Sequence, residues 1–333
     1  MMRKALLIAA AVSLALGTGN MGASAQEKLT PMKLTLNFLA AGPNAGFMYA
    51  KKLGLYEKAG IDLTIEEGKG SGTTAQQVAT GQTDVGFADA PAAMQLRTKG
   101  APVKIVAPVL QTNGFAIISL KETGINTPQD LVGKTVAVQP GTAQTTLLDA
   151  ILAANNIDKS QVNIVNIDPG AFVGAVLEKK VDAILGGADY HSIQMRDRGF
   201  EVTDLFYRDV GVPTVGLSII ARDDRIEKDA DLYKRFVAAS LAGWEAARKN
   251  PDEAAAAVLE QFPSVTKEQI TKQFDVVFKL MCAPGAKRLG EVPEKNWEAT
   301  YTLLTTYLDL PKDKPISDYY TTALLPADAP ACE

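Results

Sequence analysis

Between residues 34 and 89, short apolar runs alternate with helical segments, and small polar residues follow the apolar runs. The apolar runs read LTLNF, IDLTIEE and TDVGFAD, and the segments between them read AAGPNAGFMYAKKLGLYEKAG and GKGSGTTAQQVATGQ. This alternation predicts parallel strands joined by helices. Because the loops after such strands gather at one edge of the sheet, where open α/β folds bind ligands, the stretch predicts a ligand cleft.

A second series of the same parts follows, with the strand-like runs KTVAVQ, VNIVNI, VDAILGG and EVTDLF. The runs at 113–120 and 215–221 are typical of strands that carry the chain between two lobes. We expect a two-lobed α/β fold in which each lobe is a mostly parallel sheet flanked by helices. Lobe 1 would contain residues 26–113 and 215–333 with the C-terminal helices, and lobe 2 residues 114–214. Two such lobes can close on a ligand about a hinge.

The N-terminus predicts a secretory signal peptide over residues 1–25. Arg3 and Lys4 precede an apolar run at 5–16, and Ala23-Ser24-Ala25 forms a small-residue cleavage site. The apolar run is short for a bilayer span, although a membrane anchor is the alternative. No cysteine lies near the cleavage site, so we expect a soluble exported protein rather than a lipoprotein.

Charge and cysteine content narrow the functional class. Without the first 25 residues, 32 basic and 38 acidic residues remain, a net charge of −6, and no basic footprint for nucleic acid is present. The two cysteines, Cys282 and Cys332, lie in the last quarter of the chain. In an oxidising compartment we expect one disulfide between them, and free or intermolecular thiols are the alternative.

Two glycine-containing loops that open helices are candidate binding elements. Gly72 and Thr73 lie in the GKGSGT loop of the first lobe, and Pro140-Gly141-Thr142 forms the corresponding loop of the second. Backbone N–H groups at a helix start bind anions or polar groups, whereas ordinary turns and helix caps are the alternative. Neither loop matches a phosphate-binding or dinucleotide-binding motif.

Side chains suited to a planar ring follow the predicted strands. Phe38 and Tyr190 can stack on a ring, while Asn37 and Asn44 can orient it, although plain packing of the aromatics is the alternative. Asp89 can accept hydrogen bonds from a ligand amine, or it can cap the helix that follows.

Groups for catalysis are few. The single histidine, His191, lies in a predicted helix beside Asp189 and Tyr190, and three consecutive helical residues point in different directions. We therefore expect no metal site, no cofactor and no catalytic residues. The chain also lacks a nucleophile-elbow motif.

The chain resembles the periplasmic solute-binding proteins of ABC importers for thiamine pyrimidine precursors, and their relatives for alkanesulfonates, taurine and nitrate. The resemblance rests on LNFLAAGPNAGFMYAKKLGLYEKAGIDLTI, GSGTTAQQVATGQTDVGFAD, LQTNGFAIISLKETGINTPQDLVGKTVAV and VDAILGG, which cover most of residues 32–221. It implies capture of a solute between the lobes and docking of a monomer on an inner-membrane permease and ATPase complex.

By position, the resemblance implies a site made of residues from both lobes. These are Asn37, Phe38, Asn44, Gly72, Thr73, Asp89, Asn113, Thr142 and Gly187, to which Tyr190 is added from the residues themselves. Asn37-Phe38 stands where the pyrimidine-precursor branch often has Asp-Trp.

We expect a binding protein for a small planar solute, aromatic or heterocyclic, with or without an acidic group. A sulfonate, taurine or nitrate binder of the same family is one alternative. A pyrimidine-precursor synthase is another, although the cysteine-rich iron motif of the eukaryotic synthases does not occur in this chain. A sensory binding protein is a third.

Overall fold

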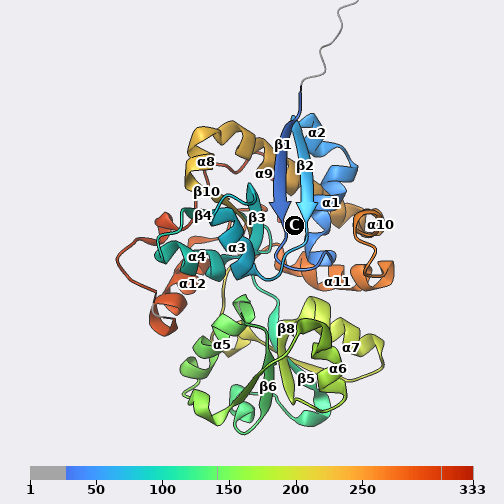
Figure 1. Cartoon of the computed structure of the whole chain (residues 1–333), viewed down its shortest axis with the longest axis vertical. Helices are drawn as coiled ribbons and strands as arrows, with labels where there is room; N and C mark the ends of the chain where they lie inside the picture. Colours follow the sequence, from blue (N-terminus) through green and yellow to red (C-terminus); the bar gives the residue numbers. More distant parts are fainter. Residues whose placement is uncertain (1–27, 141, 309, 333) are drawn as a thin grey trace, which may run out of the picture.

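The computed structural model describes residues 28–140, 142–308 and 310–332. The predicted signal peptide therefore lies outside the described residues. Two five-stranded sheets, each covered by helices, form two lobes (Figure 1). The predicted two-lobed α/β fold is confirmed.

The first sheet has the strand order β2-β1-β3-β10-β4. Its strands are β1 (Thr30–Thr35), β2 (Ile61–Glu66), β3 (Val85–Asp89), β4 (Val103–Pro108) and β10 (Leu217–Arg222). β1 pairs in parallel with β2 and β3, whereas β10 is antiparallel to both of its neighbours. The late strand β10 therefore completes a sheet that the first hundred residues begin.

The second sheet repeats this pattern with the order β7-β6-β8-β5-β9. Its strands are β5 (Phe115–Leu120), β6 (Thr135–Val138), β7 (Asn163–Asn166), β8 (Ala183–Gly187) and β9 (Val202–Phe206). Here β5 is the antiparallel strand, between β8 and β9. In both sheets the antiparallel strand is the one that the chain enters after crossing between the lobes.

Helices cover both sheets and share the core with the strands. In lobe 1 they are α1 (Ala45–Lys52), α2 (Leu55–Lys58), α3 (Ser71–Ala79), α4 (Ala90–Thr98), α8 (Asp223–Lys228), α9 (Ala230–Lys249), α10 (Pro251–Gln261) and α11 (Lys267–Leu280). In lobe 2 they are α5 (Ala143–Ala154), α6 (Phe172–Leu177) and α7 (Ile193–Asp197). The close approach of α1 to α9 depends on Gly46, because a Cβ there would lie 2.3 Å from the Trp244 ring.

The two crossing segments run side by side. Leu110 and Leu217 are joined by a backbone hydrogen bond, as are Asn113 and Thr214. Helix α12 (Glu294–Tyr307) lies against this hinge, where Thr300 Oγ1 accepts a hydrogen bond from Val215 N at 3.0 Å. α12 also packs against α5 of lobe 2. The predicted division places α12 with lobe 1, and the structure adds that α12 contacts both the crossing segment and α5 of lobe 2.

The C-terminal segment is fastened covalently and by packing. Cys282 and Cys332 form a disulfide, and both pack against the lobe 1 core.

Within the described part of the chain, no helix combines the length and apolarity needed to cross a bilayer.

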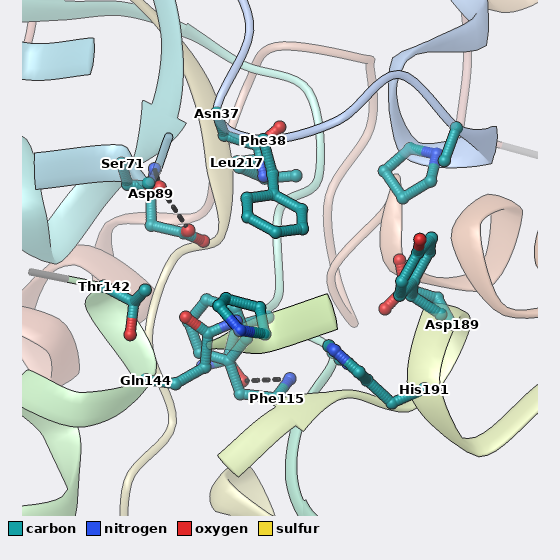
Figure 2. A pocket seen from close by; sticks show the side chains of 18 of the residues that line it. Asn37, Phe38, Ser71, Asp89, Phe115, Thr142, Gln144, Asp189, His191 and Leu217 are labelled. Atoms are coloured by element: carbon teal, nitrogen blue, oxygen red, sulfur yellow. Dashed lines mark hydrogen bonds between the residues drawn. The ribbon is translucent and has the colours of Figure 1, made fainter. Parts of the chain in front are cut away.

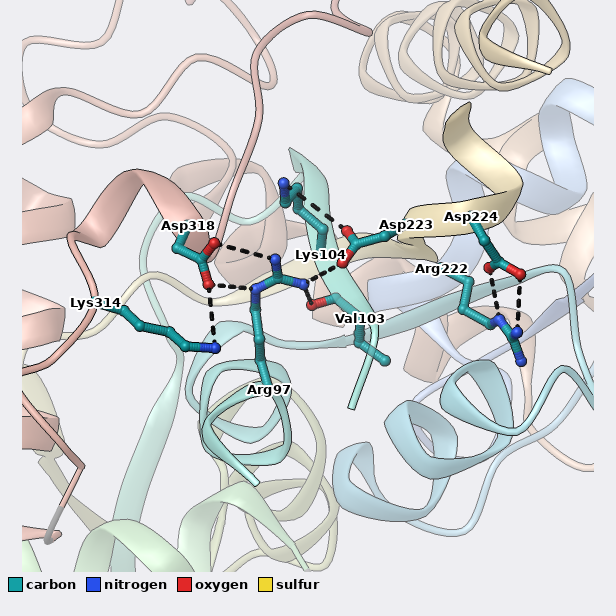
Figure 3. A network of polar contacts seen from close by, with 8 residues as sticks. All are labelled: Arg97, Val103, Lys104, Arg222, Asp223, Asp224, Lys314 and Asp318. Carbon is teal, nitrogen blue, oxygen red and sulfur yellow. Dashed lines mark hydrogen bonds and ion pairs between the residues drawn. The ribbon is translucent and has the colours of Figure 1, made fainter. Parts of the chain in front are cut away.

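A buried arginine ties the C-terminal segment to lobe 1 (Figure 3). The Arg97 guanidinium on α4 donates to Asp223 at 2.6 Å, to Asp318 at 3.0 Å and to the Val103 carbonyl at 3.0 Å. Only 10% of the Arg97 side chain is exposed, whereas the two carboxylates are about 30% exposed. Removing the arginine would leave two partly desolvated carboxylates without their main partner.

We predict that Arg97→Ala lowers the free energy of unfolding by about 2–4 kcal/mol, because one partner of a buried charge network is lost. Urea unfolding followed by circular dichroism measures the change. Lys159→Ala is the control, because Lys159 forms an exposed ion pair with Asp149, and such pairs contribute little. Equal losses in the two variants would contradict a structural role for the network.

Candidate ligand-binding site

A cavity of about 900 Å³, counting the part open to solvent, lies between the lobes. Residues at the ends of β1, β2, β3 and β4 or in the loops after them form most of its lobe 1 wall, and residues at the ends of β6, β7 and β8 or after them form most of its lobe 2 wall. The antiparallel strands β5 and β10 begin at the same place, with Phe115 and Leu217. A cavity of this size accommodates a small molecule.

Most of the predicted site residues line this cavity. They are Asn37, Phe38, Asn44, Asp89, Asn113, Thr142, Gly187 and Tyr190. Gly72 and Thr73 do not: both lie inside α3, and Thr73 is exposed. Because α3 begins at Ser71, Gly70 and Ser71 form the wall in their place.

The loop after β1 is held in place by internal hydrogen bonds. Asn44 Nδ2 donates to Asn37 Oδ1 at 3.0 Å, so the Asn37 amide keeps its two N–H groups for another partner. Gly70 N donates to the Asn37 carbonyl at 2.8 Å, and Gly68 N donates to the Phe38 carbonyl. Phe38 is thereby positioned at the cavity (Figure 2).

Ser71 positions the buried Asp89 carboxylate. The Ser71 hydroxyl donates to Asp89 Oδ2 at 2.8 Å and accepts from the Asp89 backbone N–H at 3.1 Å. Gly70, which precedes α3, has φ 119°, a conformation that favours glycine. Asp89 precedes α4 without capping it through its side chain, so the expected alternative role as a helix cap is not adopted.

Asn113 and Thr142 line the cavity, but their polar atoms are engaged within the protein. Asn113 Nδ2 donates to Thr214 Oγ1, and its Oδ1 accepts from Phe115 N at 3.2 Å. Asn113 therefore joins the two crossing segments. The Thr142 hydroxyl accepts from Thr145 N at 3.3 Å and so caps α5, which is the alternative that the sequence left open.

Asp189 and His191 also line the cavity, which the sequence analysis did not predict. These residues lie in a helical segment, as expected, but Ala188–Ser192 is a π-helical turn rather than a regular α-helix. Gly186 and Gly187 make room for it. A Cβ on Gly187 would lie within 2.3 Å of Asp189 Oδ1, and one on Gly186 would lie 2.6 Å from His191 Nδ1. In the sequence, Gly186-Gly187 was the one sign that the side chains of Asp189 and His191 need space at this position.

Further lining residues were not singled out from the sequence. They are mainly apolar and amide side chains: Leu39, Pro43, Leu110, Phe115, Gln139, Gln144, Pro169, Phe172, Leu185, Leu217 and Leu280. Strand periodicity does not show which apolar residues face a cavity and which face a core.

Burial shifts the pKa values of the two carboxyl groups and the imidazole that line the cavity. Burial, and then the charge of Asp189, raise the pKa of Asp89 to about 7, although the Ser71 hydrogen bond opposes the shift. Burial raises the pKa of Asp189 to about 6; this side chain is only partly covered, so we expect a smaller effect in solution than at Asp89. Burial lowers the pKa of His191 to about 4 and keeps its imidazole neutral at pH 7.

In the described part of the chain, no three histidine, cysteine or acidic side chains gather as a metal site would require. Cys282 and Cys332 are absent from the residues that line the cavity and are bonded to each other. The described lining residues therefore offer carboxylate, imidazole, amide and aromatic groups for recognition.

The family model described as NMT1/THI5 like matches residues 43–254, more than half of the chain. The chain belongs to the NMT1/THI5-like family. The matched region contains much of both cavity walls, from Pro43 to Leu217.

Curated relatives of this NMT1/THI5-like chain include two binding proteins and a synthase. The formylaminopyrimidine-binding protein of Halalkalibacterium halodurans is 26% identical over 86% of this chain and 88% of its own. The riboflavin-binding protein RibY of Chloroflexus aurantiacus is 27% identical over 76% and 73%. The 4-amino-5-hydroxymethyl-2-methylpyrimidine phosphate synthase of Legionella pneumophila is 24% identical over 88% and 92%.

Solved structures show the same fold. The periplasmic aliphatic sulphonate binding protein SsuA of Escherichia coli superimposes with a TM-score of 0.67 and 18% sequence identity, over 87% of this chain and 96% of that one. The NMT1/THI5-like chain thus has the fold of a periplasmic binding protein.

We predict that Asp89→Asn gains stability relative to wild type, by more than about 1 kcal/mol, as pH rises from 4.5 to 8. In the wild type, the unfolded chain loses the Asp89 proton near pH 4, whereas the folded protein keeps it until about pH 7. The stability of the wild type therefore falls as pH rises over this range, and Asp89→Asn, which carries no such proton, does not share this loss. Urea unfolding of the ligand-free protein at both pH values measures the difference.

Asp149→Asn, on the exposed side of α5, is the control. If the free energies of unfolding of Asp89→Asn and wild type differed by the same amount at both pH values, the carboxyl of Asp89 would not be buried as described.

Proposed function

We propose that this chain is the solute-binding component of an ABC importer and captures a small planar heterocycle between its two lobes. The observation that carries the proposal is the cavity at the ends of both sheets, lined by aromatic and amide side chains. Membership of a family that contains binding proteins for a pyrimidine and for riboflavin supports it. The predicted signal peptide supports action in the periplasm, with delivery to a membrane permease.

Aromatic side chains from both lobes favour a planar ligand. Phe38 comes from lobe 1, and Phe115 and Tyr190 come from lobe 2. Flat rings stack on such side chains, whereas the free N–H groups of Asn37 can orient a ring acceptor. A ring held from both sides would favour the closed form over the open one, which is the differential binding that drives closure.

The electrostatics disfavour the sulfonate and nitrate alternatives. The starts of α3 and α5 face the cavity, and helix N-termini attract anions. However, the Asp89 carboxylate already lies at the start of α3 through Ser71, and no lysine or arginine occurs among the described lining residues. An anion would therefore meet two carboxyl groups, of which Asp89 is only partly ionised at pH 7, without a full positive charge to offset them. The same argument disfavours an acidic group on the ligand.

The synthase among the relatives makes an enzyme the alternative from a different class. His191, Asp89 and Asp189 are the groups of the described cavity wall that could serve such chemistry, because the described lining residues include no cysteine or lysine. Incubation of the purified protein with each bound compound, followed by mass spectrometry, separates the two functions. Unchanged ligand supports binding alone, and conversion of the ligand contradicts it.

We predict that Phe38→Ala weakens binding of a planar ligand by roughly 5- to 150-fold, since stacking of a base on an aromatic side chain contributes about 1–3 kcal/mol. Isothermal titration calorimetry with an aminopyrimidine and with riboflavin measures the change, after a thermal-shift screen that includes an aliphatic sulfonate and nitrate.

Phe200→Ala is the matched control, because Phe200 is 40% exposed and lies outside the cavity wall. Equal affinities of wild type and Phe38→Ala for every planar compound that binds would contradict the proposed mode of recognition.

A further inference from the structure

A second cavity lies at the hinge and shares no lining residue with the cavity between the lobes. It measures about 570 Å³, counting the part open to solvent. Both crossing segments, the 3₁₀ turn that follows β9 and the start of α12 line it, through Thr112, Arg208, Pro213, Thr214, Lys295, Asn296 and Ala299. We call this cavity the hinge pocket. Its described wall contains two basic side chains and no acidic one.

The Arg208 guanidinium is held on the lobe 2 side of the hinge pocket. It lies over the Phe206 ring, 4.2 Å from the ring centroid, and its Nη1 donates to the Asn113 carbonyl at 3.4 Å. Its ion pair with Asp209 is loose, because the Nε–Oδ1 distance is 3.8 Å and that carboxylate is 63% exposed. A guanidinium has five N–H donors, so Arg208 retains donors for an acceptor in the pocket.

Helix α12 supplies the second positive charge of the hinge pocket. Lys295 forms no hydrogen bond or ion pair with the described residues. Burial, and then the charges of Glu294 and Glu298, raise the pKa of Tyr320, so these two carboxylates face Tyr320 rather than the pocket. The hinge pocket is therefore a basic site in a protein that has more acidic than basic residues.

Asn296 gives an independent indication that a partner is missing from the hinge pocket. Its side chain lines the pocket, yet its Oδ1 atom is buried and has no hydrogen-bond partner among the described residues. A buried amide oxygen without a donor is costly. This atom therefore points to a molecule that brings a hydrogen-bond donor into a site that is otherwise suited to an anion.

Two cations and one acceptor fit hydrogenphosphate better than other small anions. The phosphate oxygens accept charge-assisted hydrogen bonds from guanidinium and ammonium groups, and arginine can bind two of them at once. At neutral pH inorganic phosphate also retains a P–OH group, which can donate to Asn296 Oδ1. Sulfate has the same tetrahedral shape but no proton to donate.

We propose that the hinge pocket binds inorganic phosphate. Arg208 and Lys295 bind its charged oxygens, and Asn296 Oδ1 accepts a hydrogen bond from its hydroxyl. This inference goes beyond the proposed capture of a planar solute, because the site lies outside the cavity between the lobes and uses other residues.

The test titrates the protein, purified without phosphate, with inorganic phosphate, methyl phosphate and sulfate by isothermal titration calorimetry at pH 8 and constant ionic strength. All three probes are mainly dianions at this pH, because a phosphate monoester loses its second proton near pH 6. Only inorganic phosphate still has a hydroxyl. We expect one equivalent of phosphate to bind at least tenfold more tightly than methyl phosphate or sulfate.

Three variants assign the site to its residues. Arg208→Gln and Lys295→Gln should each weaken phosphate binding at least tenfold, because each removes a charge-assisted hydrogen bond. Asn296→Leu, which removes the acceptor, should lower the affinity for phosphate to near that for sulfate and change the affinity for sulfate by less than threefold. Lys159→Gln is the control and should bind like the wild type, because Lys159 is exposed and lies outside the pocket. Circular dichroism establishes that each variant is folded.

The outcomes decide the inference without reference to the solute. Absence of saturable phosphate binding, or equal affinities of the wild type for phosphate and sulfate, overturns it. Unchanged phosphate affinity in the Arg208 and Lys295 variants overturns it as well. None of these results bears on the proposed solute-binding function, which depends on the cavity between the lobes.

Discussion

The structure depends on the way in which each sheet is completed. In both lobes the strand beside the crossing is antiparallel to its neighbours: β10 lies between β3 and β4, and β5 lies between β8 and β9. These strands begin where the parallel strands end, so both crossing segments and the carboxyl ends of the parallel strands meet at one place. The cavity and the hinge are consequently formed by the same few residues. Asn113 illustrates this, because it lines the cavity while its amide joins the two crossing segments.

The second feature that determines which ligand the cavity binds is its charge. The cavity is rich in aromatic and amide groups, and its charged members in the described wall are the carboxylates of Asp89 and Asp189. A protein with this fold can therefore bind different ligands between the same two lobes when the charged residues at the strand ends differ. Two other features hold the C-terminal part of the chain against the lobes. Helix α12 contacts the hinge and α5, and the Arg97 network anchors the segment after α12.

Much of this arrangement was predictable from the sequence. The alternation of strands and helices gave the lobes, and the loop after β1 gave Asn37, Phe38 and Asn44. The errors have local causes. Gly72 and Thr73 were assigned to the cavity by position from the resemblance, whereas α3 begins at Ser71 and both residues lie inside it. Asp189 and His191 were missed because a π-helical turn cannot be recognised from periodicity, although Gly186-Gly187 marks the space that their side chains fill. The Oδ1 atom of Asp89, which has no hydrogen-bond partner among the described residues, became evident only with the geometry.

The central claim is that the cavity selects a small planar heterocycle and releases it unchanged. Native mass spectrometry of the freshly purified protein, followed by release and identification of any bound molecule, tests this most directly. The account predicts one equivalent of a neutral or cationic planar heterocycle whose mass stays constant on prolonged incubation. A bound sulfonate or nitrate, or a bound compound that is converted during incubation, would contradict it.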